Sequence, residues 1–162
     1  MNSELCLYKI DSNYLKFIHK IDYRISVKYN NRPFVGIITM INEINYVLPL
    51  TSQTTEERKN EGKNKRASDI TTFVKDSTGM EIANILYNNM FPVVDGVYSV
   101  CEIDATTDTY ESNEIRYIRK NADKIIHKAQ KVYKKRIENT NSFYNKVCCN
   151  FAKLEKECLL YR

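Results

Sequence analysis

Residues 32–52 read RPFVGIITMINEINYVLPLTS and hold the two longest apolar stretches of the chain. Phe34–Ile41 is almost continuously apolar, which is typical of a strand buried on both faces. Asn42–Asn45 supplies turn-forming residues, and Tyr46–Leu50 is apolar again. The pattern predicts a β-hairpin in which residues 46–52, YVLPLTS, form the returning strand.

The other apolar stretches predict a first helix and further strands. Leu5–Ile10 is typical of a short strand, and Ser12 stands where the N-cap of a helix is expected. That helix carries apolar side chains at helical spacing, at Tyr14, Phe17, Ile18 and Ile21. Strand signals separated by turn residues recur later, at Ile70–Val74, Met80–Leu86, Phe91–Val94 and Val97–Ile103.

The last third of the chain changes to a helical period. Apolar residues recur at three- and four-residue steps between Ile115 and Ile137, which predicts one long amphipathic helix. Ser142 is placed to cap a second helix that runs to Cys158. This order of elements predicts an α+β domain over residues 1–162, with a mostly antiparallel sheet and helices at both ends of the chain.

The composition is typical of a soluble globular protein, with 43% hydrophobic and 28% charged residues and a net charge of +5. No leader sequence is recognisable, and the apolar stretches are far shorter than a membrane span, so no membrane association is expected. The five cysteines are odd in number and lack a CxxC pair, which predicts reduced thiols and a cytoplasmic location. The neighbours Cys148 and Cys149 are expected to be packed rather than redox-active.

Two regions are rich in basic side chains. Gln53–Ser68 has no large apolar residue and is expected to be a loop with a helical turn at Thr55–Lys59; its cations are Arg58, Lys59, Lys63, Lys65 and Arg66. The predicted long helix carries the second group away from its apolar stripe: Arg116, Lys120, Lys124, Lys128, Lys131 and Lys135, with Arg119 beside them. Such a face is often only solvated surface, but it also suits the neutralisation of nucleic-acid phosphates.

Several kinds of catalytic site are absent from the sequence. There is no HExxH or CxxC motif, no tight acidic cluster and no glycine-rich phosphate loop, so no metal, no other cofactor and no NTPase activity are expected. A ribonuclease that uses a histidine pair would need His19 and His127 to converge, although they lie far apart in the sequence.

What remains is a set of hydroxyls and cations at the ends of the predicted hairpin. Tyr29 and Arg32 precede the first strand, and Thr51 and Ser52 end the second, so a hairpin would bring the four together. Metal-free RNA cleavage uses the 2′-hydroxyl as nucleophile and needs a proton acceptor, cations near the phosphate and an acid for the leaving oxygen. The alternative is that Thr51 and Ser52 only cap the following loop.

Four stretches resemble the ToxN/AbiQ family of type III toxins, CptN-like members included: YNNRPFVG at 29–36, YVLPLTS at 46–52, IRYIRKNADKI at 115–125 and CNFAKLE at 149–155. The resemblance covers nearly the whole chain, and a strand that ends in PLTS is its most specific part. It implies a compact, strongly twisted antiparallel sheet flanked by helices, related to the Kid/MazF toxin fold.

The same resemblance implies a sequence-preferring, metal-independent endoribonuclease toxin that causes growth arrest or abortive infection by phage. Cellular or phage RNA would be cut to a 2′,3′-cyclic phosphate and a 5′-hydroxyl. The implied partner is an RNA antitoxin made of pseudoknot repeats, which alternates with toxins in a closed protein–RNA hetero-oligomer.

Residue by residue, Tyr29 matches the family's active-site tyrosine, and Arg32 stands where family members carry a lysine. Thr51 and Ser52 match the threonine and serine of the PLTS strand end. The sequence departs from the family at Thr54, where a lysine is common, and we expect Lys63 or Lys65 of the polar loop to replace it. Lys59, Arg66 and the basic helix residues named above are expected to bind RNA.

One alternative from a different class stays open. A non-catalytic RNA- or DNA-binding protein would use the same basic helix without any cleavage chemistry. A purely structural interaction domain would account for neither PLTS nor the basic stripe. The toxin hypothesis and the nucleic-acid-binding hypothesis differ in one respect: only the toxin hypothesis requires Ser52 and its neighbours for cleavage.

Overall fold

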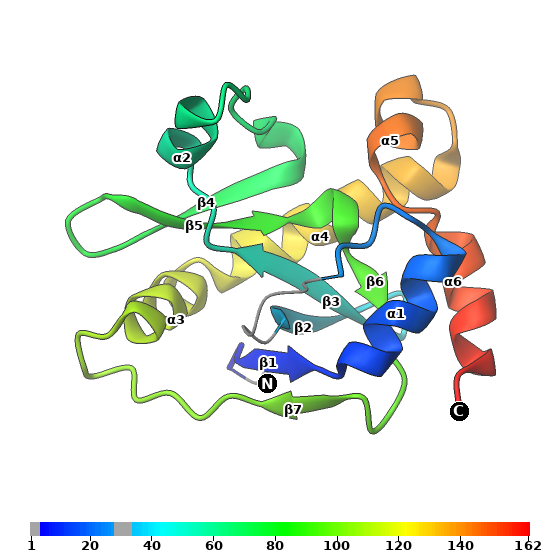
Figure 1. Ribbon diagram of the computed structural model, residues 1–162, viewed down its shortest axis with the longest axis horizontal. Helices are drawn as coiled ribbons and strands as arrows, with labels where there is room; N and C mark the ends of the chain where they lie inside the picture. The colour runs from blue at the N-terminus through cyan, green and yellow to red at the C-terminus, as the bar shows by residue number, and fades with distance from the viewer. Residues whose placement is uncertain (1–3, 28–33) are drawn as a thin grey trace.

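The computed structural model describes residues 4–27 and 34–162, and its elements alternate between one sheet and the helices around it (Figure 1). The strands are β1 (Leu7–Ile10), β2 (Phe34–Ile41), β3 (Ile44–Thr51), β4 (Thr71–Lys75), β5 (Glu81–Leu86), β6 (Phe91–Pro92) and β7 (Tyr98–Val100). The helices are α1 (Ser12–Ile21), α2 (Thr55–Asn60), α3 (Tyr110–Lys120), α4 (Ala122–Glu138), α5 (Ser142–Val147) and α6 (Phe151–Glu157). Short 3₁₀ turns occur at Ser68–Ile70, Tyr87–Asn89 and Cys158–Leu160.

The strands form an antiparallel sheet in the order β4-β5-β3-β2-β1-β7. The edge of β3 away from β2 is shared by two strands. β6 pairs with its first half, at Tyr46 and Val47, and β5 pairs with its end, at Leu50 and Thr51. Together with the helices around the sheet, this confirms the predicted α+β class. The end of β3, at Leu50 and Thr51, pairs with β5, whereas its register with β2 ends at Pro49.

The hairpin predicted from residues 34–52 is confirmed. β2 and β3 pair from Gly36↔Pro49 to Ile41↔Ile44, and the turn is shorter than expected because only Asn42 and Glu43 form it, with φ of 51° and 65°. Two successive residues with positive φ match the right-handed twist of a hairpin. The expectation that the first strand is buried on both faces is wrong at its end, because Met40 is 58% exposed.

The two hairpin strands are held closely together at Gly36. A Cβ atom built at this position would lie 2.5 Å from Cγ1 of Val47 and 2.8 Å from the carbonyl oxygen of Leu48. Glycine is therefore required there by packing, since the backbone of β3 cannot retreat from a methyl group without breaking its pairing with β5 or β6.

The predicted N-caps are wrong by one residue at two helices. Asp11, not Ser12, caps α1, and its carboxylate accepts a hydrogen bond from the backbone N–H of Asn13. Asn141, not Ser142, caps α5 and accepts from the N–H groups of Phe143 and Tyr144. Asp and Asn are at least as good as Ser in this role, and the serine then becomes the first helical residue.

The single long helix expected over 115–137 is wrong, since the chain forms two helices, α3 and α4, that meet at Asn121. Asn121 leaves helical geometry (φ −110°, ψ 20°), and its side-chain amide donates to the carbonyl oxygen of Tyr117. The apolar period continues across the break because both helices bury their apolar stripes in the same core.

The second C-terminal helix is also divided, into α5 and α6, with Cys148–Asn150 between them. The carboxylate of Asp22 accepts a hydrogen bond from the backbone N–H of Asn150, 2.7 Å away, and this contact fixes the break. Cys148 and Cys149 are fully buried there, which confirms that they are packed; burial raises the pKa of the Cys148 thiol to about 12.

An aromatic cluster joins the C-terminal helices to the sheet. The rings of Tyr46, Tyr133 and Phe151 lie 5.6–5.9 Å apart between centroids. The carboxylate of Glu155 accepts hydrogen bonds from both tyrosine hydroxyls, at 2.5 Å from Tyr46 and 2.7 Å from Tyr133. The two tyrosines would otherwise bury unpaired hydroxyls, so Glu155 fixes α6 against β3 and α4.

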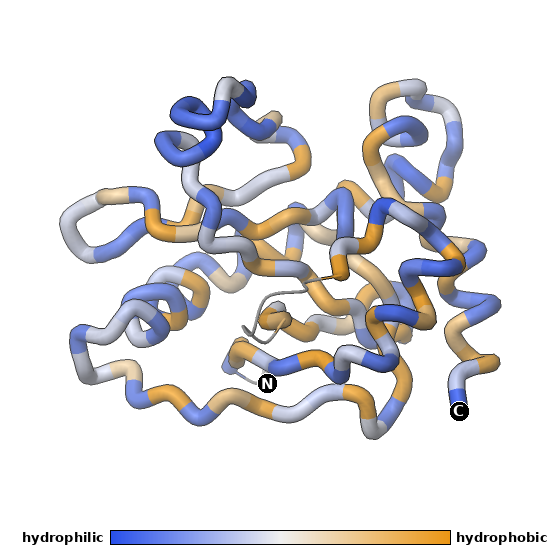
Figure 2. The backbone as a smooth tube through the Cα atoms, viewed as in Figure 1, coloured by the Kyte–Doolittle hydropathy of each residue, from blue (hydrophilic) through white to orange (hydrophobic). Residues whose placement is uncertain are grey.

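The hydropathy of the chain follows this arrangement, with apolar residues along the central strands and polar residues over the 53–68 loop and α2 (Figure 2). The loop with a helical turn was predicted and is confirmed by α2. Within residues 4–27 and 34–162, no helix combines the length and apolar character that crossing a membrane requires.

Candidate active site

The predicted site lies where β3 leaves the sheet. Thr51 is the last residue of the strand and is half-buried, and Ser52 directly after it is exposed. Because β2 and β3 are antiparallel, the start of β2 lies at the same end of the hairpin as Thr51. Tyr29 and Arg32, the other two members of the predicted set, lie outside the described residues.

The hydroxyls of Thr51 and Ser52 at the strand end have different surroundings. Oγ1 of Thr51 accepts a hydrogen bond from the backbone N–H of Gln53 at 3.2 Å, which is the loop-capping role considered as the alternative. Ser52 has its side chain in solvent, where it can meet a substrate. Thr54, at the position of the missing lysine, is the N-cap of α2 and accepts from the N–H of Glu57.

Two guanidinium groups contact Gln53 after the strand end: Arg58 donates to its Oε1 at 3.3 Å, and Arg66 makes the larger set of contacts. Its guanidinium donates to the backbone oxygen of Gln53 at 2.9 Å, to Oε1 of Gln53 at 2.8 Å and to Oδ1 of Asn84 at 3.0 Å. Asn84 is in turn the residue that pairs with Thr51 across the sheet. Burial lowers the pKa of Arg66, and the neighbouring charge of Arg58 lowers it further. A partly desolvated guanidinium therefore contacts Gln53, which follows Ser52, and Asn84, which pairs with Thr51.

Glu81 supports this arrangement from β5. Its carboxylate accepts from the backbone N–H of Thr55 at 2.6 Å, from the hydroxyl of Thr55 at 2.7 Å and from Nδ2 of Asn84 at 2.8 Å. Burial by itself would raise the pKa of Glu81, but the hydrogen bonds from Asn84 and Thr55 outweigh it and lower the pKa. The ionised carboxylate thus fixes both the start of α2 and the orientation of Asn84.

The loop lysines lie further from the strand end than Arg66. Lys63 is exposed, and its ammonium lies 3.7 Å from a carboxylate oxygen of Glu61. Lys65 lies over the ring of Phe73, 4.8 Å from its centroid, on the strand beyond β5. Lys59 is exposed on α2. The oxygen of Glu61 that faces Lys63 also accepts from Nε2 of Gln53, so Lys63 lies near the residue that follows Ser52. Lys65 lies two strands away from Thr51.

The basic stripe of the C-terminal third is divided by the fold into two groups. Three of its members hold parts of the chain together. The guanidinium of Arg116 donates to the carbonyl oxygens of Ala105 and Thr107, and that of Arg119 donates to the carbonyl oxygen of Leu5. The ammonium of Lys128 donates to the carbonyl oxygen of Thr71 at 2.7 Å, and burial is the main reason that its pKa is lowered.

The other members are exposed. Lys120 ends α3, and Lys124, Lys131 and Lys135 follow along α4. Lys124 and Lys131 also line a hollow of about 610 Å³ with His127, Lys128 and Tyr144. These exposed lysines are the part of the stripe that can meet the phosphates of a nucleic acid.

The two histidines belong to different parts of the fold. A ring nitrogen of His19 lies 2.6 Å from the carbonyl oxygen of Ile25, which fixes the chain after α1. His127 lines the hollow beside α4, and His19 is not among the residues of that hollow. In the part of the chain that the structure describes, no three or more His, Cys, Asp or Glu side chains are grouped so that they could hold a metal ion.

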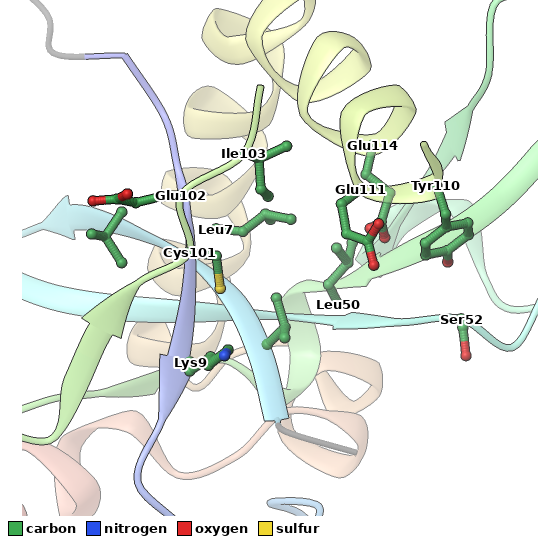
Figure 3. A pocket seen from close by; sticks show the side chains of 12 residues that line it. Leu7, Lys9, Leu50, Ser52, Cys101, Glu102, Ile103, Tyr110, Glu111 and Glu114 are labelled. Atoms are coloured by element: carbon green, nitrogen blue, oxygen red, sulfur yellow. The ribbon is translucent and has the colours of Figure 1, made fainter. Parts of the chain in front are cut away.

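A second hollow, of about 670 Å³, adjoins Ser52 (Figure 3). Its lining comes from β1, β2, β3, β7 and the start of α3 and includes Lys9, Leu50, Cys101, Glu111 and Glu114. Sequence reasoning missed these residues as functional candidates. One signal was available for Lys9, because the charged residue interrupts the apolar strand Leu5–Ile10 and must face solvent or a cavity.

Solved structures share this fold. The chain superposes on AbiQ, described as a lactococcal anti-phage endoribonuclease of a type III toxin–antitoxin system, with a TM-score of 0.82 and 23% identity over 98% of both chains. A type III toxin described as inhibited by a non-coding RNA pseudoknot superposes with a TM-score of 0.78 and 25% identity, again over 98% of both chains. The fold is therefore that of the toxin component of type III systems.

Sequence comparison identifies the family. Residues 6–158 match the family model of the toxin ToxN of type III toxin–antitoxin systems, and the chain belongs to this family, as its motifs predicted. Endoribonuclease ToxN of Bacillus thuringiensis subsp. kurstaki is 27% identical over 96% of this chain and 83% of its own length. Endoribonuclease AbiQ of Lactococcus lactis subsp. lactis is 24% identical over 97% of this chain and 89% of its own length.

Proposed function

We propose that this chain is an endoribonuclease toxin of a type III toxin–antitoxin system, acting in the cytoplasm as one domain over residues 1–162. The observation that carries the proposal is the end of β3, where Ser52 is exposed and Arg66 donates to its neighbour Gln53 and to Asn84, the partner of Thr51. Membership of the ToxN family supports the reaction class, because the relatives are named endoribonucleases.

The chemistry proposed for this site needs no metal. The 2′-oxygen of the RNA attacks the adjacent phosphorus, the P–O5′ bond breaks, and the products are a 2′,3′-cyclic phosphate and a 5′-hydroxyl. Thr51 and Ser52 contact the phosphate, and Arg66 adds positive charge near the oxygens on which negative charge develops. Tyr29 and Arg32 are proposed to complete the site, with proton transfer assigned to Tyr29 or to a loop lysine.

The partner proposed for inhibition is an RNA antitoxin built of pseudoknot repeats, in a closed assembly with several toxin copies. A similar toxin is described as selectively inhibited by a non-coding RNA pseudoknot. The exposed lysines of α3 and α4 offer a surface for such an RNA, since each phosphate contact releases a counterion.

The test is cleavage of RNA by the purified protein in excess EDTA. We expect cleavage products with a cyclic phosphate and a 5′-hydroxyl, and we expect Ser52→Ala to abolish both cleavage and growth arrest. Ser77→Ala, at an exposed serine in the turn between β4 and β5, is the matched control and should keep full activity.

Circular dichroism must show that the Ser52→Ala protein is folded. Wild-type cleavage by a folded Ser52→Ala variant would refute the site, and cleavage that requires a divalent ion would refute the mechanism. A wild-type protein that binds RNA without cutting it would identify a non-catalytic RNA-binding protein instead.

A further inference from the structure

The hollow beside Ser52 has an apolar floor and charged walls. Leu7 of β1, Val35 of β2 and Leu50 of β3 form the floor, and its volume of about 670 Å³ is in the range of small-molecule pockets. In Figure 3, Glu111 and Glu114 reach from α3 toward Leu50, and Ser52 lies further along the same strand. Ser52 therefore borders this hollow, although its hydroxyl points away from the two carboxylates in this view.

The walls carry charges of both signs. Lys9 reaches in from β1, and the carboxylates of Glu111 and Glu114 come from the first turns of α3. Lys9 and Glu111 both act on Cys101: burial raises the pKa of this thiol, Lys9 lowers it and Glu111 raises it. The ammonium of Lys9 and the carboxylate of Glu111 therefore lie near the same thiol and have opposite effects on its pKa.

A phosphate does not fit the acidic wall of this hollow. The carboxylates of Glu102, Glu111 and Glu114 line this hollow and would repel it. A nucleobase does fit, because its faces are apolar and its edges carry N–H donors. An apolar floor accepts the face of the base, and a carboxylate accepts its exocyclic amino group, as Glu and Asp do with cytosine.

We propose that this hollow, with Glu111 as the discriminating side chain, binds a nucleobase that carries an exocyclic amino group, next to the bond that is cut. The inference rests on the proposed ribonuclease function and adds its substrate specificity. Uracil is disfavoured, because two carbonyl oxygens flank its N3–H and face the carboxylate. Lys9 lies at the β1 side of the same hollow, where it meets the negative charge of the RNA backbone.

The test uses cleavage of an RNA library with random bases, followed by sequencing of the products. We expect the wild-type protein to cut RNA with uridine at one position flanking the cut bond at least about tenfold more slowly. This factor corresponds to the loss of one hydrogen bond to a charged group. Glu111→Gln should reduce this preference to about twofold or less, because the amide offers a donor as readily as an acceptor.

Glu138→Gln is the matched control. Glu138 is exposed at the end of α4 and is not among the residues that line the hollow, so the same loss of charge should leave the preference intact. Oligonucleotides with adenine, cytosine, guanine or amino-free purine at the selected position then show which amino group is read. The amino-free purine should be cut as slowly as uridine.

An unchanged preference in Glu111→Gln, or equal cleavage of the preferred base and its analogue without the amino group, would overturn the inference. Either result leaves the ribonuclease function standing, because the wild-type and Glu138→Gln proteins still cut the library. Failure of the proposed function is a different result, namely no Ser52-dependent cleavage of any library member.

Discussion

The guanidinium of Arg66 donates a 3.0 Å hydrogen bond to Oδ1 of Asn84, and Asn84 is the residue that pairs with Thr51 across the sheet. The polar loop between α2 and β4 thus folds back onto the end of β3. Since Arg66 also donates to the backbone and side chain of Gln53, one cation fixes the residues on both sides of Ser52. We interpret Arg66 as the residue that positions this strand end.

Arg66→Met is expected to lower kcat for RNA cleavage by about 10²-fold, the scale found when catalytic groups are misplaced by about 1 Å. Arg66→Lys should recover only a small part, because an ammonium cannot donate to Gln53 and Asn84 in the same fork geometry. Single-turnover kinetics measure the effect, and Lys75→Met at the exposed end of β4 is the control. If Arg66→Lys restores the full rate, charge alone matters and positioning does not.

A second prediction concerns the lysine that replaces the one absent at Thr54. Lys65 lies over Phe73, whose partner across the sheet is Asn84, and Asn84 pairs with Thr51. Adjacent strands are about 4.8 Å apart, so Phe73 is about 10 Å from Thr51. The long side chain of Lys65 can reach across part of this distance.

Lys65→Met or Lys63→Met should therefore slow cleavage far more than Lys59→Met. Lys63 faces the Glu61 oxygen that also accepts from Gln53, whereas Lys59 is exposed on α2. Rates of single-turnover cleavage compare the three variants. Equal and small effects would place the proton acceptor elsewhere, with Tyr29 as the next candidate.

The hairpin and its strand end could be predicted because their signals are local. An apolar run, a turn and a second apolar run need no information from the rest of the chain. The breaks at Asn121 and at Cys148–Asn150 could not be predicted in this way, because they are fixed by distant contacts. Asp22, for example, accepts from the N–H of Asn150, which follows it by 128 residues.

The same difference between local signals and distant contacts applies to the candidate site. Thr51 and Ser52 follow from the strand pattern and the family motif, whereas Arg66 was expected only to bind RNA. Nothing in the polar loop indicates that it folds back on Gln53. The pocket residues Lys9 and Glu111 come together only through the pairing of β1 with β7 and the packing of α3, so their proximity is a product of the tertiary structure.

A third prediction concerns stability and pH. Glu81→Gln should lower the free energy of unfolding at pH 7 by about 2 kcal/mol, since it removes charge-assisted hydrogen bonds to Thr55 and Asn84. The folded-state pKa of Glu81 is lowered from its ordinary 4.5, so its contribution is present above pH 4.5 and is lost as the pH falls through the folded pKa.

The difference between wild-type and Glu81→Gln should therefore shrink in acid. Urea unfolding at pH 7, pH 4 and pH 3 measures it, and Glu102→Gln at an exposed position is the control. A difference that stays constant down to pH 3 would contradict the role assigned to the ionised carboxylate.

The last prediction separates the two groups of basic residues on α3 and α4. Lys120 and Lys124 are exposed, whereas Arg116 donates to the carbonyl oxygens of Ala105 and Thr107. Changing Lys120 and Lys124 together to Met should weaken binding of the repeat RNA antitoxin and reduce the slope of log affinity against log salt by about 1.5, because each phosphate contact contributes about 0.7–0.9. Arg116→Met should instead lower the melting temperature and leave the salt slope nearly unchanged. Cleavage by the free toxin should change little in the lysine variant, because the proposed chemistry lies at the end of β3. An unchanged slope in the double variant would show that this face is only solvated surface and that the antitoxin binds elsewhere.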